Sequence, residues 1–277
     1  MRTSNIDYKV VNDFGLEWNK FNYNNINNIE LKKIFNDYFR IFPFNKISKN
    51  SIGFDMGSGT GRWAKFIAPK VKKLNCIEPS NLAIKQSKLN LKVYKNCIFE
   101  NSSVSKNSLK DNSQDFGYSL GVLHHLPNTL LALKSCTRKL KSGAPFLLYL
   151  YYCFDNKPKW FKMIWKISDI VRISIYNLPF FLKYPISQFI AFFVYLPFSK
   201  ILKILKKNKI EIKNFPLSYY HDKSFYIMRT DALDRFGTKI EKRFSRNEIE
   251  IMMKKSQLKN IKFSNKQPYW VAIGTKI

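Results

Sequence analysis

Acidic residues are scarce in this chain of 277 residues. Nineteen aspartates and glutamates stand against 48 lysines and arginines, and the formal net charge is +29. Thirty-nine of the basic residues are lysines, and asparagine, isoleucine, phenylalanine and tyrosine are also abundant, as an AT-rich genome would make them. We therefore interpret the charge as coding bias spread over a solvated surface. The alternative is attraction to nucleic acid, anionic lipid or phosphorylated sugar.

Metal-binding and disulfide patterns are missing as well. The four cysteines form no CxxC pair and have no histidine at a spacing suited to a metal. Cys76 and Cys97 fall in apolar runs, where a thiol is usually a small buried hydrophobe. The first residues contain no apolar segment of the kind found in signal peptides. We therefore expect no metal site, reduced cysteines and a cytoplasmic protein.

A long uncharged run is also absent from the aromatic central part of the chain. Its longest such run, residues 184–199, has 16 residues and contains Pro185 and Pro197, whereas a membrane-spanning helix needs about 20. Eleven basic residues and one acid lie between Lys157 and Lys209. This pattern favours helices of a cap whose apolar faces pack on the rest of the protein. Peripheral contact with an anionic membrane and a dimer interface are the alternatives.

A glycine-rich turn is the most informative feature that the chain does contain. Gly57, Gly59 and Gly61 follow Asp55 at alternating positions after an apolar run. Glycines so spaced allow a tight turn and let a ligand lie against bare backbone. Glu78 ends the next apolar run, 21 positions after Gly57. A carboxylate about 20 residues after such a turn accepts hydrogen bonds from ribose hydroxyls, so the pattern indicates a nucleotide-binding βαβ unit.

Strand and helix signals alternate along most of the chain. Strands are predicted at residues 52–56, 74–78, 97–99, 116–120 and 145–151, with helices between them. Such alternation predicts a parallel sheet with right-handed crossovers. A helix over 249–258 and two short strands, 261–263 and 269–273, predict a hairpin that closes the sheet.

Three parts of the chain follow from this pattern. Residues 1–50 are predicted to form an N-terminal helical arm or lid. Residues 51–154 and 229–277 would form the catalytic domain, and residues 155–228 an inserted cap or substrate region.

Together, these motifs resemble the class I S-adenosylmethionine-dependent methyltransferases, particularly the type 11-like subgroup with small-molecule substrates. The resemblance rests on the Asp-x-Gly-x-Gly-x-Gly order of residues 55–61, on the strand and Leu-His-His-Leu-Pro turn of residues 115–127, and on the serine-capped helix start at residues 244–250. It implies an α/β fold with a Rossmann-like, seven-stranded, mostly parallel sheet, an antiparallel final hairpin and a mostly helical inserted cap. It also implies S-adenosylmethionine as the cofactor.

The same resemblance implies a set of cofactor-binding residues. Asp55 is expected to help position the amino-acid part of the cofactor, and Glu78 the ribose. The whole set is Asp55, Gly57, Ser58, Gly59, Gly61, Glu78, Pro79, Ser103, Val104 and Leu120. The family often has an acid at the end of the third strand for the adenine amine, but this chain reads Asn-Ser-Ser-Val there. We expect Ser103 or the backbone of Val104 to serve instead.

Two of the three histidines, His124 and His125, occupy the turn after the fourth strand. If the reaction needs a base, His125 is the candidate because of its position in the loop, and His124 is a candidate substrate contact. The alternative is that one or both orient the loop through backbone hydrogen bonds. Trp18 is a candidate for a lid over the site or, alternatively, for the core.

The third histidine, His221, lies in the insertion beside Tyr219 and Tyr220. A segment of this composition can recognise a hydroxylated ligand and supply a base, so His221 is the second candidate base and the tyrosines are candidate substrate contacts. An ordinary surface loop is the alternative. Arg229, where the chain is expected to re-enter the catalytic domain, is a further candidate for substrate contact.

Several acceptors are compatible with these features. Methyl transfer mainly requires alignment of the reacting atoms, and a base only where the nucleophile must lose a proton. We favour O-methylation of a small molecule or a sugar or glycan precursor. A lipophilic or lipid-linked acceptor at the membrane surface is the second hypothesis. A nucleic-acid methyltransferase rests on charge alone, and residues 120–123 read Leu-Gly-Val-Leu instead of a base-flipping Asn-Pro-Pro-Tyr motif. A non-catalytic cofactor-binding protein is the last alternative, and the oligomeric state stays open.

Overall fold

The computed structural model describes residues 5–23 and 26–277 and divides into two compact units. The first unit comprises Met1–Cys153 and Ile240–Ile277, and the second comprises Phe154–Lys239. The second boundary lies later than the sequence indicated, because α9 (Phe225–Gly237) belongs to the insertion. Residues 1–4 and 24–25 of the predicted N-terminal arm lie outside the described residues.

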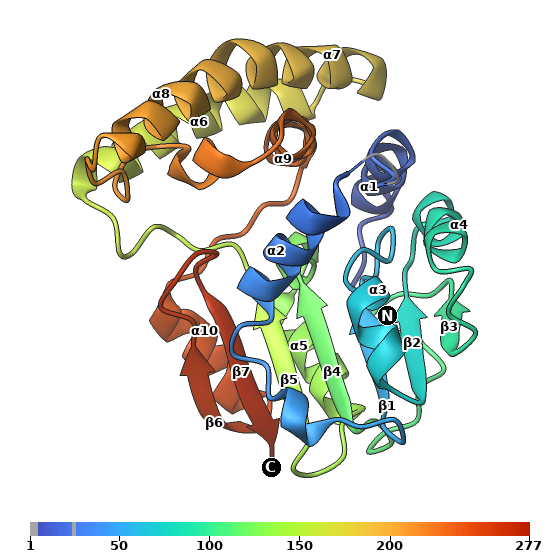
Figure 1. Ribbon diagram of the computed structural model, residues 1–277. Coiled ribbons are helices and arrows are strands. Elements are labelled where there is room, and N and C mark those ends of the chain that lie inside the picture. The colour runs from blue at the N-terminus through green and yellow to red at the C-terminus, as the bar shows by residue number, and fades with distance from the viewer. Residues whose placement is uncertain (1–4, 24–25) are drawn as a thin grey trace. The chain divides into compact units, whose positions relative to one another are not determined.

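A seven-stranded sheet forms the centre of the first unit (Figure 1). Its strands are β1 (Ile52–Met56), β2 (Lys73–Ile77), β3 (Cys97–Glu100), β4 (Phe116–Leu120), β5 (Pro145–Tyr149), β6 (Leu258–Phe263) and β7 (Val271–Lys276). They are ordered β3-β2-β1-β4-β5-β7-β6. Strands β1 to β5 pair in parallel, whereas β7 is antiparallel to both β5 and β6. This arrangement confirms the predicted fold class.

Helices cover both faces of this sheet because its strands are apolar on both sides. The helices of the first unit are α1 (Tyr8–Lys20), α2 (Asn28–Tyr38), α3 (Ala64–Ile67), α4 (Asn81–Asn90), α5 (Thr129–Arg138) and α10 (Arg246–Lys255). Phe54 and Phe146 share one core with buried side chains of α5 and α10. On the opposite face, Phe39 at the end of α2 packs edge-on against Tyr118 of β4, with ring centroids 5.2 Å apart.

Local signals set the ends of several helices. Ser80 caps α4, Asn128 caps α5, and Ser245 forms a reciprocal capping box with Glu248 at the start of α10. The predicted helix after the glycine turn is much shorter than expected. It spans only Ala64–Ile67 and passes into a 3₁₀ turn that contains Pro69, because proline cannot continue the ladder of backbone donors.

The insertion is helical, with α6 (Lys159–Tyr176), α7 (Phe180–Ile190), a π-helical turn (Ala191–Tyr195), α8 (Leu196–Lys207) and α9. Among the described residues one helix, Phe180–Lys207, is long and apolar enough to cross a membrane by length and composition. The uncharged run of residues 184–199 had indicated no such helix. The helix is longer than that run because it continues through both of its prolines and beyond the run at each end.

Candidate functional site

The turn after β1 has a backbone that only glycine adopts easily. Gly57, Gly59 and Gly61 have φ angles of +80°, +54° and +78°, in the left-handed region that other residues disfavour. A Cβ atom on Gly57 would also lie 2.5 Å from the Val122 side chain, so this position has no room for one. The backbone N–H groups of Gly57 and Ser58 donate to the carbonyl oxygen of Ile77, which fixes the turn against β2.

Glu78 ties the end of β2 to this turn. Its Oε2 accepts a hydrogen bond of 2.9 Å from the backbone N–H of Gly59, and its Oε1 accepts one of 2.9 Å from the backbone N–H of Ser80. Burial raises the pKa of the Glu78 carboxyl to about 7, although the two hydrogen bonds oppose the shift. The site therefore holds a carboxylate that is oriented before any ligand arrives and ionises near neutral pH.

Asp55 lies beneath the pocket and not on its wall. Its side chain is buried next to Tyr118, its partner on β4 in the register of the sheet. Burial raises the pKa of Asp55 to about 8, because the nearby Tyr118 hydroxyl and Arg62 offset only part of the cost of removing the charge from water. This acid is consequently neutral at pH 7, and a direct cofactor contact by Asp55 stays a prediction.

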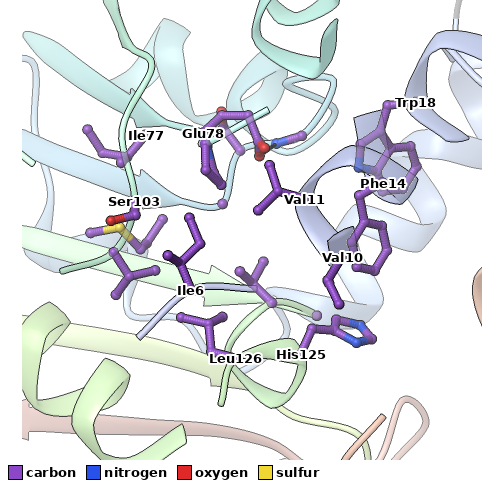
Figure 2. Close-up of a pocket in the computed structure, with 18 of the residues that line it drawn as sticks. Ile6, Val10, Val11, Phe14, Trp18, Ile77, Glu78, Ser103, His125 and Leu126 are labelled. Atoms are coloured by element: carbon purple, nitrogen blue, oxygen red, sulfur yellow. Dashed lines mark hydrogen bonds between the residues drawn. The ribbon is translucent and has the colours of Figure 1, made fainter. Parts of the chain in front are cut away.

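A pocket opens between the glycine turn and the N-terminal helix (Figure 2). The space within it, open solvent included, is about 920 Å³. The floor comes from the carboxyl ends of β1, β2 and β4 and from residues 102–104 after β3. Open α/β sheets bind ligands at this edge.

Helix α1 supplies the opposite wall of the pocket. Asp7 starts this helix by accepting hydrogen bonds from the backbone N–H groups of Lys9 and Val10. Val10, Phe14 and Trp18 follow at intervals of four residues, and all three line the pocket. The indole nitrogen of Trp18 would lie 3.4 Å from a Cβ atom on Gly59, so the ring lies directly over the glycine turn.

His125 lies at one end of the same pocket, against the ring of Phe14 at a centroid distance of 4.8 Å. Its Nδ1 is 2.6 Å from the carbonyl oxygen of Ile240. His124 does not line the pocket. Its ring is fully buried against Tyr151, with centroids 3.9 Å apart, and burial holds its pKa well below the usual range.

Comparison with known proteins identifies the fold of this unit. Residues 54–148 match the family model of a methyltransferase domain. The chain contains a class I S-adenosylmethionine-dependent methyltransferase domain. No curated protein matches the sequence.

Two solved structures share the fold of this methyltransferase at low sequence identity. One is a methyltransferase from Thermotoga maritima, described as a possible histamine N-methyltransferase, with 15% identity and a TM-score of 0.51 over 95% of this chain and 100% of that chain. The other belongs to the complex of the Haloferax volcanii Trm112 methyltransferase activator with a methyltransferase. It has 10% identity and a TM-score of 0.51 over 95% of this chain and 96% of that chain.

The pocket fits S-adenosylmethionine, the cofactor of this family. Bare backbone at Gly57 and Gly59 lets a ligand approach closely, and Glu78 presents a carboxylate of the kind that binds ribose hydroxyls. The buried hydroxyls of Ser58 and Thr60 also line the pocket, and neither has a hydrogen-bond partner in the described part of the chain. Buried polar groups are normally satisfied, so these two hydroxyls indicate a place for a polar ligand.

Most of the predicted cofactor residues come together in this pocket, namely Gly57, Ser58, Gly59, Glu78, Pro79, Ser103, Val104 and Leu120. Gly61 is different. A Cβ atom there would lie 2.7 Å from Leu91 and Ser87 of the α4 region, so this glycine allows close packing between the turn and that helix. We assign Gly61 a packing role for this reason.

The remaining predicted residues belong to the insertion, and their role in the reaction stays a prediction. Both ring nitrogens of His221 have partners within the insertion. Nδ1 is 2.8 Å from the carbonyl oxygen of Ser218, and Nε2 is 2.7 Å from the Lys206 ammonium nitrogen. Its basic nitrogen is therefore engaged by a cation.

The predicted substrate contacts of the insertion also have partners within that unit. Arg229 binds Gln188 and the Tyr184 hydroxyl, and the Tyr220 hydroxyl donates to Asp231. Tyr219 packs edge-on against Tyr220, with ring centroids 5.3 Å apart.

Sequence reasoning missed several pocket residues, namely Ile6, Val10, Val11, Phe14, Arg62 and Val122. The spacing of Val10, Phe14 and Trp18 after a capping aspartate was the available signal for the arm. Val122 carried no signal, because its contact with Gly57 depends on how β4 pairs with β1.

Proposed function

We propose that this enzyme methylates a hydroxyl group of a small molecule or of a sugar or glycan precursor, and that His125 is the base. The observation that carries the proposal is the contact between Nδ1 of His125 and the carbonyl oxygen of Ile240. A carbonyl oxygen only accepts hydrogen bonds, so it holds the proton of the neutral ring on Nδ1. Nε2 then carries the lone pair of the imidazole.

Several residues support this role by fixing the ring. Phe14 packs against one side of His125, and His124 and Tyr151 pack against another, with centroid distances of 3.9 and 5.5 Å. The backbone N–H of Lys242 donates to the carbonyl of His124 and anchors the turn that carries both histidines. A base held by packing on several sides meets its substrate without reorganisation.

When bound, S-adenosylmethionine supplies a methyl group that is already activated by the sulfonium. The acceptor oxygen would take this methyl group as the sulfur–methyl bond breaks and leaves the neutral thioether S-adenosylhomocysteine, and Nε2 of His125 would accept the proton of the acceptor hydroxyl. The remaining tasks of the protein are to align the acceptor and to exclude water. The apolar wall formed by Val10, Val11 and Phe14 suits the second task.

The experiment that tests the proposal begins with the acceptor. Wild-type enzyme is incubated with labelled methyl donor and with soluble and membrane fractions of cell extract, and the methylated product is analysed for an ether bond. The variant His125→Gln keeps a polar amide at this position but has no basic nitrogen. We expect its turnover to fall by about 10²- to 10⁴-fold with little change in affinity for S-adenosylhomocysteine.

The control is His221→Gln, which removes the other candidate base. Turnover of His125→Gln within a few-fold of wild type would contradict the role of His125. A product methylated on nitrogen, carbon or sulfur would contradict the hydroxyl acceptor.

A lipophilic or lipid-linked acceptor is the second candidate, and the outward-facing apolar side chains of the insertion favour it. Activity concentrated in the membrane fraction would support it over a soluble acceptor. We expect no nucleic-acid partner, because the charge is the only feature in favour of one.

A further inference from the structure

The long helix of the insertion buries few large apolar side chains. Several of its inward positions are polar or small: Lys183, Ser187, Ala191 and Ser199 are at most 4% exposed, and Tyr195 and Leu202 are its large buried side chains. The Lys183 ammonium donates to the carbonyl of Gly237 at the end of α9. An amphipathic helix of a water-soluble unit has the opposite pattern, with lysine outward and apolar residues inward.

Large apolar side chains occupy the outward positions of the same helix. Its strongly exposed residues are Phe181, Phe189, Phe192, Phe193, Phe198, Ile201 and Ile204, each between 43 and 73% exposed. Only 22% of the apolar window of this helix is buried. A core helix of a soluble protein can be equally apolar but would be mostly buried, so that explanation does not apply here.

Helix α6 repeats this inversion. Met163, Ile164, Ile167, Ile170, Val171 and Ile173 are exposed along its outer side. On its inner side, Asp169 pairs with Arg172 at 2.6 Å and with Arg235 of α9 at 3.3 Å. Both helices therefore expose several large apolar side chains each, whereas the exposed apolar residues of most soluble proteins are scattered singly.

Charge is ordered along this pair of helices. Within the fully described stretch 167–199, none of the exposed residues is charged. Lysines stand at both ends of the stretch: Lys159, Lys162 and Lys166 on α6, and Lys200, Lys203, Lys206 and Lys207 on α8. Figure 1 shows α6 running back beside α7 and α8, so both groups of lysines lie at the open end of the hairpin and the turn at residues 177–179 forms its apolar tip.

We propose that this helical hairpin lays its outward apolar face on the surface of an anionic lipid bilayer. An interfacial helix buries its apolar face about 5–10 Å into the boundary between headgroups and acyl chains, so the inward Asp169, Arg172 and Lys183 stay outside the hydrocarbon. The lysines at the open end then contact the anionic headgroups. An uncharged apolar face bordered by lysines fits an anionic bilayer, whereas a protein partner would not require it.

The proposal predicts binding that combines charge and apolar burial. The full chain is floated with vesicles of phosphatidylcholine containing phosphatidylglycerol, and with vesicles of phosphatidylcholine alone, across a salt series. We expect preference for the anionic vesicles at low salt and retained binding at high salt, because apolar burial is not screened. Absence of binding to the anionic vesicles, or its complete loss on raising salt, would overturn the proposal.

Two matched triple variants test which surface of the protein binds the vesicles. Phe189→Ser, Phe192→Ser and Phe193→Ser together should lower the partition coefficient by at least about tenfold. Leu89→Ser, Val93→Ser and Ile98→Ser change three exposed apolar residues of the methyltransferase unit and should leave it unchanged. Helical content measured by circular dichroism, unchanged from wild type, shows that both variants are folded.

One outcome distinguishes a second copy of the chain from a bilayer. If the triple phenylalanine variant loses a concentration-dependent dimer in sedimentation but binds vesicles as wild type does, the surface is a protein interface and the proposal is wrong. None of these measurements depends on the acceptor or on His125, so failure here leaves the proposed reaction untouched.

Discussion

The helices of the two units have similar residues but place them on opposite sides. In α5 and α10 of the methyltransferase unit, Leu133 and Ile249 are buried and the lysines point outward. In the insertion, Lys183 is 1% exposed whereas Phe181 is 73% exposed. Both units therefore contain many lysines and phenylalanines, but the units differ in which of these side chains they bury and which they expose.

This difference limits what coding bias can explain. An AT-rich genome raises the frequency of lysine, isoleucine and phenylalanine, but it does not determine which side of a helix they occupy. In the methyltransferase unit most of the lysines lie where water solvates them, with Lys139 and Lys276 as buried exceptions, and bias is a sufficient explanation. In the insertion, coding bias does not explain the outward phenylalanines or the inward Asp169–Arg172–Arg235 cluster. An apolar environment around the outer face is a physical explanation for both.

The largest expected effect tests whether the methyltransferase unit depends on its glycine turn. Gly57→Ala puts a Cβ atom 2.5 Å from Val122 on a backbone with φ of +80°. We expect a loss of roughly 2–4 kcal/mol in the free energy of unfolding and loss of S-adenosylhomocysteine binding by calorimetry. Gly143→Ala is the control, because its φ is also +80° but no atom lies within 4 Å of the added carbon. Equal effects of the two changes would show that strain alone, and not the pocket, determines the result.

The second effect concerns the oriented carboxylate. Glu78→Ala removes a charge-assisted acceptor and should weaken S-adenosylhomocysteine binding by on the order of 2 kcal/mol, about 30-fold. Asp55→Asn should weaken binding less, since Asp55 is neutral at pH 7 and lies below the pocket. Titration calorimetry compares the two variants. Unchanged binding by Glu78→Ala would contradict the assignment of the ribose site.

The sequence predicted the sheet well because the relevant signals are local. Apolar runs located the strands, and the resemblance of residues 55–61 and 115–127 to a known family gave their order. Boundaries were less accurate: the helix after the turn is only Ala64–Ile67, and the insertion extends to Lys239. Pro69 explains the first difference.

The site was predicted on the side of the glycine turn, whereas on the side of the arm only Trp18 was named. Gly57 and Glu78 belong to a motif whose spacing carries its function, whereas Phe14 reaches the pocket only because Asp7 caps α1. The sequence also did not show that the helices of the insertion expose large apolar side chains and bury polar ones. Composition shows that residues 155–228 are basic and aromatic, but burial depends on tertiary contacts: Tyr195, an aromatic residue of the long helix, is only 6% exposed and packs against Tyr220.

A third and smaller expected effect is a pH dependence of S-adenosylhomocysteine binding by the methyltransferase unit. The pKa of Glu78 is raised to about 7 by burial, so the carboxyl is protonated below pH 7 and ionised above it. The ionised form is the better acceptor for ribose hydroxyls. Affinity for S-adenosylhomocysteine should therefore increase as pH rises through 7, by about tenfold between pH 6 and 8. In Glu78→Gln this dependence should vanish. An unchanged slope in that variant would assign the titration to another group.

The smallest effect addresses the polar interior of the insertion. Asp169→Asn removes the charge that Arg172 and Arg235 share, and Arg172 is buried and also donates to the carbonyl of Thr238. Because asparagine still accepts hydrogen bonds and Asp169 is partly exposed, we expect a loss of only about 1 kcal/mol in local stability. Hydrogen exchange measured by mass spectrometry should show about fivefold faster exchange in peptides from α6 and α9, with no change in β1 or β4. If exchange also accelerates in those strands, the two units do not behave independently. If nothing changes in α6 and α9, the inward acid contributes little, and the outward apolar side chains alone remain as evidence that the insertion is turned toward an apolar environment.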